Sequence, residues 1–352
     1  MPERKISIAG RGIGPSQPSY VIAEMSGNHN GDLTRAFAIM QAAKDAGADA
    51  VKLQTYTADT LTIDCDGPGF VIEGGLWDRR RLYDLYREAH TPWDWHAPLF
   101  AKGRELGITV FSSPFDASAI VLLESLDCPA YKIASFENVD LGLIARAAAT
   151  GKPLIVSTGL ANLAEIEEAV GTARRAGCRD LALLHCVSAY PAPAADAHLA
   201  AISDLARRFE VVAGFSDHTP GIAVSIAAVA LGADIIEKHV TLKRADGGPD
   251  AAFSLEPAEL KSLCEGCREA YAARGVADYG PKPSEEGSRI FRRSLYIVED
   301  VTAGAALTEK NVRSIRPGFG LAPKHLPEIL GKRAARALKR GTPLNWEMLA
   351  RK

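Results

Sequence analysis

Polar and ionisable residues close each of eight short apolar segments in the first 240 residues of the chain. Lysines, carboxylates, two histidines and several hydroxyl side chains recur at these segment ends. In chain order the set is Glu24, Lys52, Gln54, Ser112, Ser113, Lys132, Ser135, Glu137, Ser157, Thr158, Ser188, Tyr190, Ser216, Asp217, His218, Glu237, Lys238 and His239. A network of salt bridges explains any one of these residues. Because an unpaired buried charge is costly, the whole set instead predicts a ligand or metal that compensates it.

Two of these residues are histidines at the ends of consecutive segments. The imidazoles of His218 and His239 can converge on one cation and leave positions open for water and substrate oxygens. A single histidine is more often a hydrogen-bonded structural residue, whereas a pair on adjacent strand ends favours a metal. We therefore expect a divalent metal here.

The lysines and hydroxyls indicate a phosphate site. Lys52 and Lys132, with the hydroxyls of Ser135 and Ser157, supply the positive charge and short donors that bind a phosphate monoester. For either lysine alone, a salt bridge to a nearby glutamate is the structural alternative. Glu24, at the end of the first segment, is a candidate general base.

The apolar segments alternate with amphipathic helical segments, which is the pattern of a parallel sheet. Eight strands with intervening helices favour a closed (β/α)8 TIM barrel over an open doubly wound sheet, and no GxGxxG or GxxxxGK[ST] loop follows any strand. In such a barrel the carboxyl ends of the strands form the site. The expected strands cover residues 19–26, 48–55, 108–115, 129–135, 152–158, 180–188, 209–218 and 233–241.

Local patterns define the rest of the barrel. Asp32 can cap a helix whose apolar face includes Ala36 and Met40. The segments KISIAG and GRGIGPSQPSY predict a hairpin that covers the amino-terminal end of the barrel. An insertion between Gln54 and Thr109, rich in tryptophan and tyrosine, is placed to shape a substrate site.

The chain of 352 residues exceeds the roughly 250 residues of one barrel, so we expect a second, small domain. The predicted barrel spans residues 1–275, a Pro/Gly-rich linker spans 276–288, and a domain of short strands spans 289–352.

Composition excludes some classes of protein. A net charge of −2 gives no general attraction to nucleic acid or to a membrane surface, and no apolar run is long enough for a membrane span. With no signal-peptide pattern, we expect a cytoplasmic protein. The six cysteines are too scattered for a disulfide scaffold, and Cys264 and Cys267 are expected to be ordinary helix residues.

The order of the motifs resembles the sialic acid synthase family over nearly the whole chain. The matching segments are IAEMSGNHNGD, VKLQTY, FSSPFD, YKIASFE, IVSTG, LLHCVSAYPAP, FSDHT, EKHVT and SLEP. Near the end, NVRSIRPGFGL and RGTPLNWEML are similar to the antifreeze-like (SAF) domain of these enzymes. Several long motifs in a fixed order make this resemblance specific.

The resemblance implies roles for the candidate residues. His218 and His239 would bind a divalent metal, usually Mn2+ with Mg2+ or Co2+ as alternatives, and Glu24 would be the catalytic carboxylate. Positions that hold phosphoenolpyruvate in the family match Lys52, Lys132, Ser135, Ser157, Ser188, Tyr190 and Ser216. The further candidate substrate-binding residues are Gln54, Ser113, Glu137, Glu237 and Asp250.

The resemblance also implies a domain-swapped homodimer. In the family the SAF domain of one subunit covers the active site of the other, and Arg316 matches the arginine that reaches the sugar. From the sequence pattern alone, Arg316 would be a solvated turn residue. The partners expected are therefore phosphoenolpyruvate, an N-acetylated amino sugar and a second copy of the chain.

Three features resemble the pseudaminic acid synthase branch of the family. They are the Ser135-Phe136-Glu137 triplet, the insertion LYDLYREAHTPWDWH and the segment RADGGPDAAFSLEP. The acceptor in that branch is 2,4-diacetamido-2,4,6-trideoxy-L-altrose, whose 6-methyl and second acetamido groups suit an apolar wall. Loop packing is the structural alternative for the insertion's tryptophans. The arginines at 79–81 depart from the branch pattern and leave the contact of that segment with substrate open.

Other functions stay open at this point. A legionaminate or N-acetylneuraminate synthase would use the same chemistry on another sugar. An aldolase would form a Schiff base with pyruvate through Lys132. A non-catalytic sugar-binding or ice-binding protein is the alternative from a different class, although a decayed site should have lost some of its polar strand ends.

Overall fold

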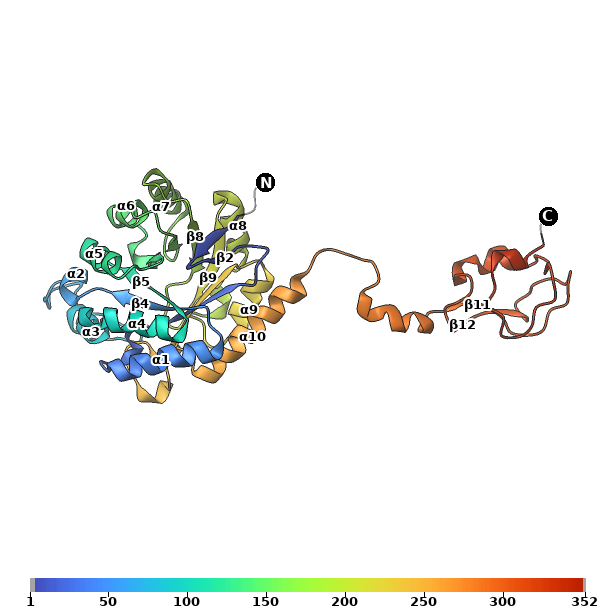
Figure 1. Ribbon diagram of the computed structural model, residues 1–352, viewed down its shortest axis with the longest axis horizontal. Helices are drawn as coiled ribbons and strands as arrows, with labels where there is room; N and C mark the ends of the chain where they lie inside the picture. The colour runs from blue at the N-terminus through green and yellow to red at the C-terminus, as the bar shows by residue number, and fades with distance from the viewer. Residues whose placement is uncertain (1–3, 351–352) are drawn as a thin grey trace. The chain divides into compact units, whose positions relative to one another are not determined.

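Eight parallel strands close into a barrel in the computed structural model, which describes residues 4–350 (Figure 1). Neighbouring strands pair in the order β10-β3-β4-β5-β6-β7-β8-β9. The predicted (β/α)8 barrel is confirmed, and each strand lies within a segment expected from the sequence. Their bounds are β3 Tyr20–Glu24, β4 Ala50–Thr55, β5 Thr109–Pro114, β6 Tyr131–Ile133, β7 Leu154–Ser157, β8 Leu181–Cys186, β9 Val212–Asp217 and β10 Ile235–His239.

Helices surround this barrel and bury their apolar faces against it (Figure 1). Asp32 caps the first one as predicted, because its carboxylate accepts a hydrogen bond from the Thr34 N–H at 2.7 Å. Gly47 ends that helix in the left-handed region with φ 84°. The helices are α1 Leu33–Ala46, α2 Ala58–Leu61, α3 Leu82–Ala89, α4 His96–Leu106, α5 Ala117–Ser125, α6 Leu141–Ala149, α7 Leu163–Arg175, α8 Ala200–Phe209, α9 Ala223–Ala230 and α10 Pro257–Arg274.

A hairpin covers the amino-terminal end of the barrel, as predicted. Its strands, β1 Ile6–Ile8 and β2 Arg11–Ile13, are antiparallel. The Ser7 N–H donates to Asp180 at the start of β8, and Arg11 pairs with Asp49 just before β4 at 2.9 Å. The isoleucines of both strands belong to the barrel core, so this end is closed by apolar packing.

The segment between β4 and β5 contains both an insertion and a regular helix of the barrel. Helix α4 is the regular barrel helix that precedes β5, so the additional segment covers residues 56–95 and carries α2 and α3. Helix α3 lies beside the short helical turn Ser26–His29 that follows β3. The additional segment therefore belongs to the carboxyl-terminal face, where the strand-end residues lie.

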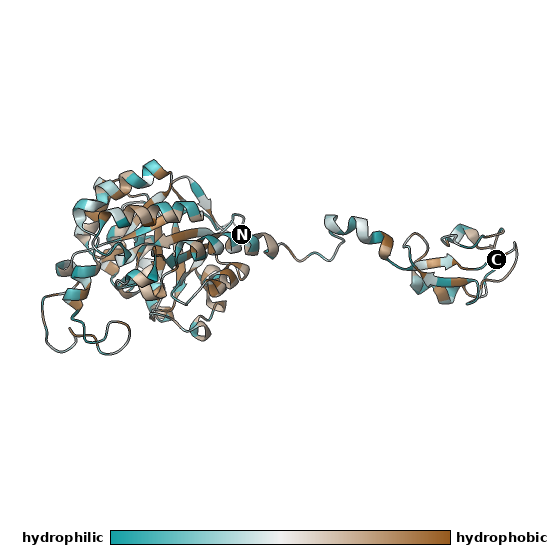
Figure 2. Ribbon diagram, turned by 90° about the horizontal axis from the view of Figure 1, so that it is seen from below, coloured by the Kyte–Doolittle hydropathy of each residue, from teal (hydrophilic) through white to brown (hydrophobic). Residues whose placement is uncertain are grey.

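A second unit, Val276–Lys352, has a core of its own. It contains a 3-10 helix Pro283–Phe291, the antiparallel strands β11 Ser294–Ile297 and β12 Val312–Ile315, and the short helix α11 Leu326–Ile329. The 3-10 helix begins inside the segment whose composition predicts a linker. In the first unit, apolar residues concentrate in the strands of the barrel (Figure 2).

None of the helices described between residues 4 and 350 combines the length and apolarity needed to cross a membrane. The six cysteines are free, and Cys264 and Cys267 are buried on α10, as expected for plain helix residues.

Candidate active site

An ion pair between Glu24 and Lys52 lies at the centre of the carboxyl-terminal face. Adjacent strands present these residues in register, and Lys52 Nζ lies 2.6 Å from Glu24 Oε2. The second oxygen of Glu24 accepts a hydrogen bond from Gln54 Nε2 at 3.0 Å, and Lys52 donates to Ser113 Oγ at 3.2 Å. Three neighbouring strands thus contribute four of the predicted residues to one network.

Glu237 extends this network across the barrel. Its Oε1 lies 3.5 Å from Lys52 Nζ and 3.9 Å from Lys132 Nζ, and it accepts a hydrogen bond from Ser216 Oγ at 3.2 Å. Its Oε2 is buried and has no hydrogen-bond partner among the described residues. Two lysines and two glutamates therefore share one buried volume with hydrogen-bonding capacity left over, as expected for a site that receives a polar ligand.

Burial shifts the proton affinities of these groups. It raises the pKa of Glu24 to about 7, against the opposing effect of Lys52. Burial alone would raise the pKa of Glu237 as well, but the ammonium groups of Lys132 and Lys52 hold it below its usual range. Burial also lowers the pKa of Lys132. Glu24 can thus gain or lose a proton near neutral pH, which suits a general acid or base.

Serine hydroxyls and a glycine form a small cradle after β6, β7 and β8. The Gly159 N–H donates to Ser135 Oγ at 3.2 Å. A Cβ on Gly159 would lie only 2.3 Å from Ser188 Oγ and 2.6 Å from Ser135 Oγ, so no larger residue fits there. Ser157 Oγ is buried without a partner among the described residues. This cradle offers short donors next to Lys132, as a phosphate requires.

The two histidines lie side by side at the ends of β9 and β10. Their ring centroids are 5.4 Å apart. His218 Nδ1 is hydrogen-bonded with Val187 O at 2.9 Å, whereas His239 Nδ1 is buried, unpartnered among the described residues and 3.9 Å from Asp250 Oδ2. Burial, followed by the nearby His218, lowers the pKa of His239 well below its usual range and keeps its imidazole neutral. Neutral imidazoles are metal ligands.

This donor set fits a metal that keeps open positions. Within residues 4–350, no group of three or more His, Cys, Asp or Glu side chains is arranged to hold a metal ion. The histidine pair would therefore leave the other coordination positions to water or substrate oxygens, as in catalytic rather than structural sites.

Asp250 and Tyr190 line the approach to the histidines. Ser26, held at φ 49°, donates a short hydrogen bond to Asp250 Oδ2. The ring of Tyr190 lies 4.4 Å from that of His218 and 5.5 Å from that of Trp77. Tyr190 thus packs between a histidine and the additional segment; its predicted contact with phosphoenolpyruvate stays a prediction.

A hollow of about 300 Å³ opens directly from these residues. Trp77 covers one side and donates its indole N–H to Pro249 O at 2.8 Å. Burial raises the pKa of Glu137, which lines the hollow, to about 7. Most of the lining is apolar or aromatic; it comprises Ser26, Gln54, Tyr56, Leu61, Ile72, Trp77, Leu82, Leu85, Tyr86, Ala89, Phe115, Ala134, Phe136, Glu137, Tyr190, His239, Pro249 and Asp250.

Three residues of the strand-end set point away from the site, contrary to expectation. Ser112 is bonded to Thr55 on the outer side of the barrel, and Thr55 is bonded in turn to His96 of α4. Asp217 and Lys238 bond to each other, and Asp217 also accepts a hydrogen bond from Ser225 of α9. Side chains alternate along a strand, so a residue between two inward-facing neighbours must face the helices.

Sequence reasoning also missed contributors to the site. The alternation of apolar and polar residues does not single out Gly159, Ser26 or Trp77. The segment Ser-Thr-Gly at 157–159 could have indicated a point where only glycine fits.

Arg316 lies in the second unit, is exposed, and has its guanidinium 6.0 Å from the Phe291 ring centroid. Its role toward the sugar remains a prediction.

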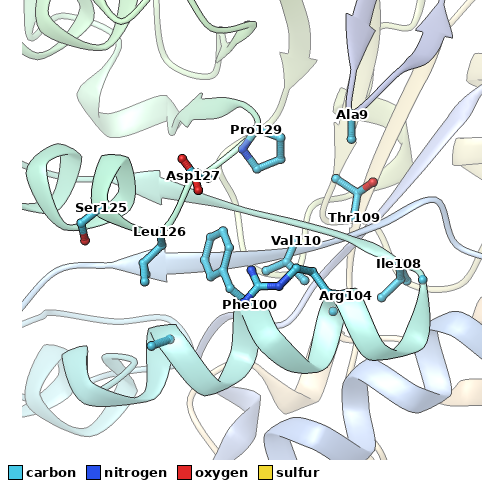
Figure 3. Close-up of a pocket in the computed structure, with 13 residues that line it drawn as sticks. Ala9, Phe100, Arg104, Ile108, Thr109, Val110, Ser125, Leu126, Asp127 and Pro129 are labelled. Carbon is cyan, nitrogen blue, oxygen red and sulfur yellow. The ribbon is translucent and has the colours of Figure 1, made fainter.

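A second hollow, of about 600 Å³, lies at the amino-terminal ends of β5 and β6 (Figure 3). Its charged lining residues are Arg104 and Asp127, and none of the strand-end residues contributes to its described lining. Because the chemistry gathers at the opposite end of the barrel, the smaller hollow is the candidate active site.

Comparison with known proteins identifies the family of this chain. The model of the NeuB family matches residues 39–279, and that of the SAF domain matches residues 292–350. The chain belongs to the NeuB family. This NeuB-family chain is 46% identical to the pseudaminic acid synthase of Helicobacter pylori, over 95% of its own length and 99% of that protein. It is 36% identical to the N,N'-diacetyllegionaminic acid synthase of Legionella pneumophila, over 95% of each chain.

A solved structure shares the fold of this NeuB-family chain. The N-acetylneuraminic acid synthetase of Leptospira borgpetersenii, in complex with citrate, superposes with a TM-score of 0.73 at 32% identity. The match covers 81% of this chain and 95% of that one. The resemblance in the sequence motifs is thereby confirmed at the level of family and fold.

Proposed function

We propose that this enzyme condenses phosphoenolpyruvate with 2,4-diacetamido-2,4,6-trideoxy-L-altrose to give pseudaminic acid and phosphate. The observation that carries the proposal is the buried network of Glu24, Lys52, Lys132 and Glu237 beside a histidine pair, in a chain 46% identical to a pseudaminic acid synthase. This arrangement joins a phosphate site, a proton carrier and a carbonyl-binding position at one barrel end.

Phosphoenolpyruvate would bind between the lysines and the serine cradle. Lys52 and Lys132 provide the positive charge, and Ser135, Ser188 and the backbone around Gly159 provide short contacts. In the free enzyme the two lysines are neutralised by Glu24 and Glu237. An arriving phosphate would therefore exchange one set of ion pairs for another rather than enter an uncompensated positive cavity.

The reaction forms one carbon–carbon bond, and at C2 a bond to the oxygen of water replaces the bond to the phosphate oxygen. C3 of phosphoenolpyruvate attacks the aldehyde carbon, and the aldehyde oxygen takes a proton from Glu24. Water adds at C2 and transfers a proton back to Glu24, whose pKa near 7 suits both transfers. The bond between C2 and the phosphate oxygen then breaks, the new C2 hydroxyl gives its proton to the departing phosphate, and the keto acid and inorganic phosphate remain. Holding both substrates between fixed side chains contributes much of the rate.

A divalent metal, Mn2+ before Mg2+ or Co2+, is part of the proposal. His218 and His239 would hold it, and when bound it would polarise the aldehyde as a Lewis acid. The chain's own part is to hold the two imidazoles side by side, which the hydrogen bond of His218 with Val187 and the 5.4 Å between the ring centroids support, while burial keeps the His239 imidazole neutral.

The hollow lined by the additional segment is the proposed acceptor site. Its apolar walls suit the 6-methyl and second acetamido groups of a diacetamido trideoxy sugar better than the hydroxyls of N-acetylmannosamine. The higher identity to the pseudaminic than to the legionaminic enzyme, 46% against 36%, supports the same choice.

Isotope labelling tests the reaction class. With phosphoenolpyruvate carrying 18O in the bridging position, C–O cleavage places the label in the released phosphate. Label retained in the sugar acid, or a pyruvate-dependent product trapped on Lys132 by borohydride, would contradict the proposal and favour the aldolase.

We further propose that two chains form a domain-swapped homodimer in which Arg316 reaches the partner's acceptor. Aromatic side chains on the second unit, such as Tyr279, Phe291 and Phe319, are exposed in the single chain and available for a partner. Mixing equal amounts of unfolded Glu24→Gln and Arg316→Ala chains and refolding them should restore about a quarter of the wild-type activity, because half of the dimers then carry one complete site. No recovery above either variant alone would contradict the swap.

We also propose that the enzyme acts in the cytoplasm.

A further inference from the structure

Behind the two histidines lies a fully buried ion pair that the chemistry above does not use. Lys238 Nζ donates to Asp217 Oδ2 at 2.8 Å, and both side chains have no exposed surface. The two residues are direct partners in the register of β9 and β10. The pair therefore joins the two strands that carry the histidines.

Alternation along the strands places this pair on the opposite side from the chemistry. Lys238 precedes His239 and Asp217 precedes His218, so each charged residue is the backbone neighbour of an imidazole. The histidines face the barrel interior, and the ion pair faces the helix layer, where Ser225 of α9 donates to Asp217 Oδ2 at 2.5 Å.

Further hydrogen bonds extend the connection beyond His218. Asp217 Oδ1 accepts from the Thr219 N–H at 2.7 Å, and Lys238 Nζ donates a short bond to Thr219 O. One ammonium group thus binds the residue before His218 and the residue after it. The backbone on both sides of His218 is fixed relative to the residue that precedes His239.

An ion pair at this position is not required by the barrel itself. Outward residues near the ends of three other strands are buried and apolar, namely Leu53 on β4, Ile133 on β6 and Val156 on β7, and the outward Ser112 on β5 is polar but carries no charge. Apolar residues of similar volume are often as stabilising as a buried ion pair or more so. The charged pair is thus unusual where it occurs, directly behind the two imidazoles.

We infer that the Asp217–Lys238 pair is a positioning device that sets the distance and mutual orientation of the His218 and His239 imidazoles. Outer groups that orient metal-binding side chains act in this way. The consequence for metal affinity rests on the proposed function, whereas the geometric claim concerns the metal-free protein and stands separately.

The test uses the full-length protein and three variants. Lys238→Met leaves the Asp217 carboxylate unpaired, and the double variant Asp217→Asn/Lys238→Met removes both charges while an amide can still bond with Thr219. Asp234→Asn is the matched control, since Asp234 is a buried carboxylate at the other end of β10. Thermal unfolding shows that each protein is folded. The readouts are the imidazole 1H–15N resonances of His218 and His239 without metal, and the affinity for Mn2+.

We expect both histidine resonances to move in the double variant but not in Asp234→Asn, and Mn2+ affinity to fall about 10- to 100-fold. A purely structural role predicts instead that the double variant, which has no unpaired charge, behaves as the wild type. Unchanged resonances with unchanged Mn2+ affinity in the folded double variant would overturn the inference. Wild-type protein that binds no Mn2+ would overturn the metal proposal, and the resonances would still decide the positioning claim.

Discussion

Lys52 Nζ lies 2.6 Å from Glu24 Oε2 and 3.5 Å from Glu237 Oε1, so one ammonium group contacts two carboxylates from the neighbouring strands β3 and β10. The geometry holds Glu24 in contact with a cation and yet leaves its pKa at about 7, because burial outweighs the attraction. A single side chain can therefore act as base and acid in one turnover.

Glu24→Gln should lower kcat by about 10²- to 10⁴-fold, the usual contribution of a general acid or base. The amide keeps the shape of the side chain, and Lys52 retains Glu237 as a counter-charge, so we expect the protein to fold. The measurement is phosphate release at saturating substrates. Glu168→Gln, on the exposed face of α7, is the control and should behave as the wild type. A Glu24→Gln enzyme with more than about a tenth of wild-type kcat would exclude Glu24 from this role.

Metal removal should abolish turnover, and added Mn2+ should restore it. His239→Ala should be inactive at any Mn2+ concentration and should still unfold near the wild-type temperature, because its imidazole faces the site rather than the core. Assays after dialysis against a chelator, with Mn2+, Mg2+ and Co2+ added back, measure this. Full activity of His239→Ala in chelator would contradict the metal proposal.

Leu85→Gln should raise KM for the acceptor about 10-fold and leave KM for phosphoenolpyruvate unchanged. Leu85 is buried on α3 and lines the hollow, and a loss of apolar contact of this size is worth about 1–3 kcal/mol. Leu231→Gln, exposed at the end of α9, is the matched control. Equal increases in both KM values would show that the variant disturbs the whole site and not the acceptor alone.

Asp234 should make the barrel less stable as the pH rises from about 4 to 7. Burial raises the pKa of this carboxyl to about 7, above its value in the unfolded chain, so the folded state holds its proton more tightly within that window. Its favourable contribution is complete below the unfolded pKa and is lost as the pH passes the folded one. Asp234→Asn should therefore stabilise the protein more at pH 8 than at pH 5, as measured by urea unfolding at both values. An equal effect at the two pH values would contradict the shift.

The sequence alone predicts the barrel because the apolar pattern of each strand agrees with the capping and turn residues that bound the neighbouring helices. Eight apolar runs, helix caps such as Asp32 and closing glycines such as Gly47 leave few other topologies, and the site follows because strand ends converge in this fold. Glu24, Lys52 and Glu237 were therefore predicted correctly as members of one cluster.

Other features depend on contacts that no local pattern encodes. The hydrogen bond from Trp77 to Pro249 joins residues 172 positions apart and closes the hollow. The side chains of Asp217 and Lys238 point outward because side chains alternate along a strand. This direction can be assigned only once it is known which neighbouring residues of the same strand face inward. The need for glycine at position 159 arises from two serines, Ser135 and Ser188, that follow other strands. Each of these required the three-dimensional arrangement.

A competition assay tests the identity of the acceptor most directly. The enzyme, Mn2+ and phosphoenolpyruvate are incubated with equal amounts of 2,4-diacetamido-2,4,6-trideoxy-L-altrose, its manno-configured diacetamido counterpart and N-acetylmannosamine, and the sugar acids formed are separated by mass and retention time. We predict that pseudaminic acid forms at least about 100-fold faster than either competitor product, because a site that matches the groups of its own substrate rejects sugars that lack them. Preferential formation of N-acetylneuraminic acid or of the legionaminic product would contradict the assignment.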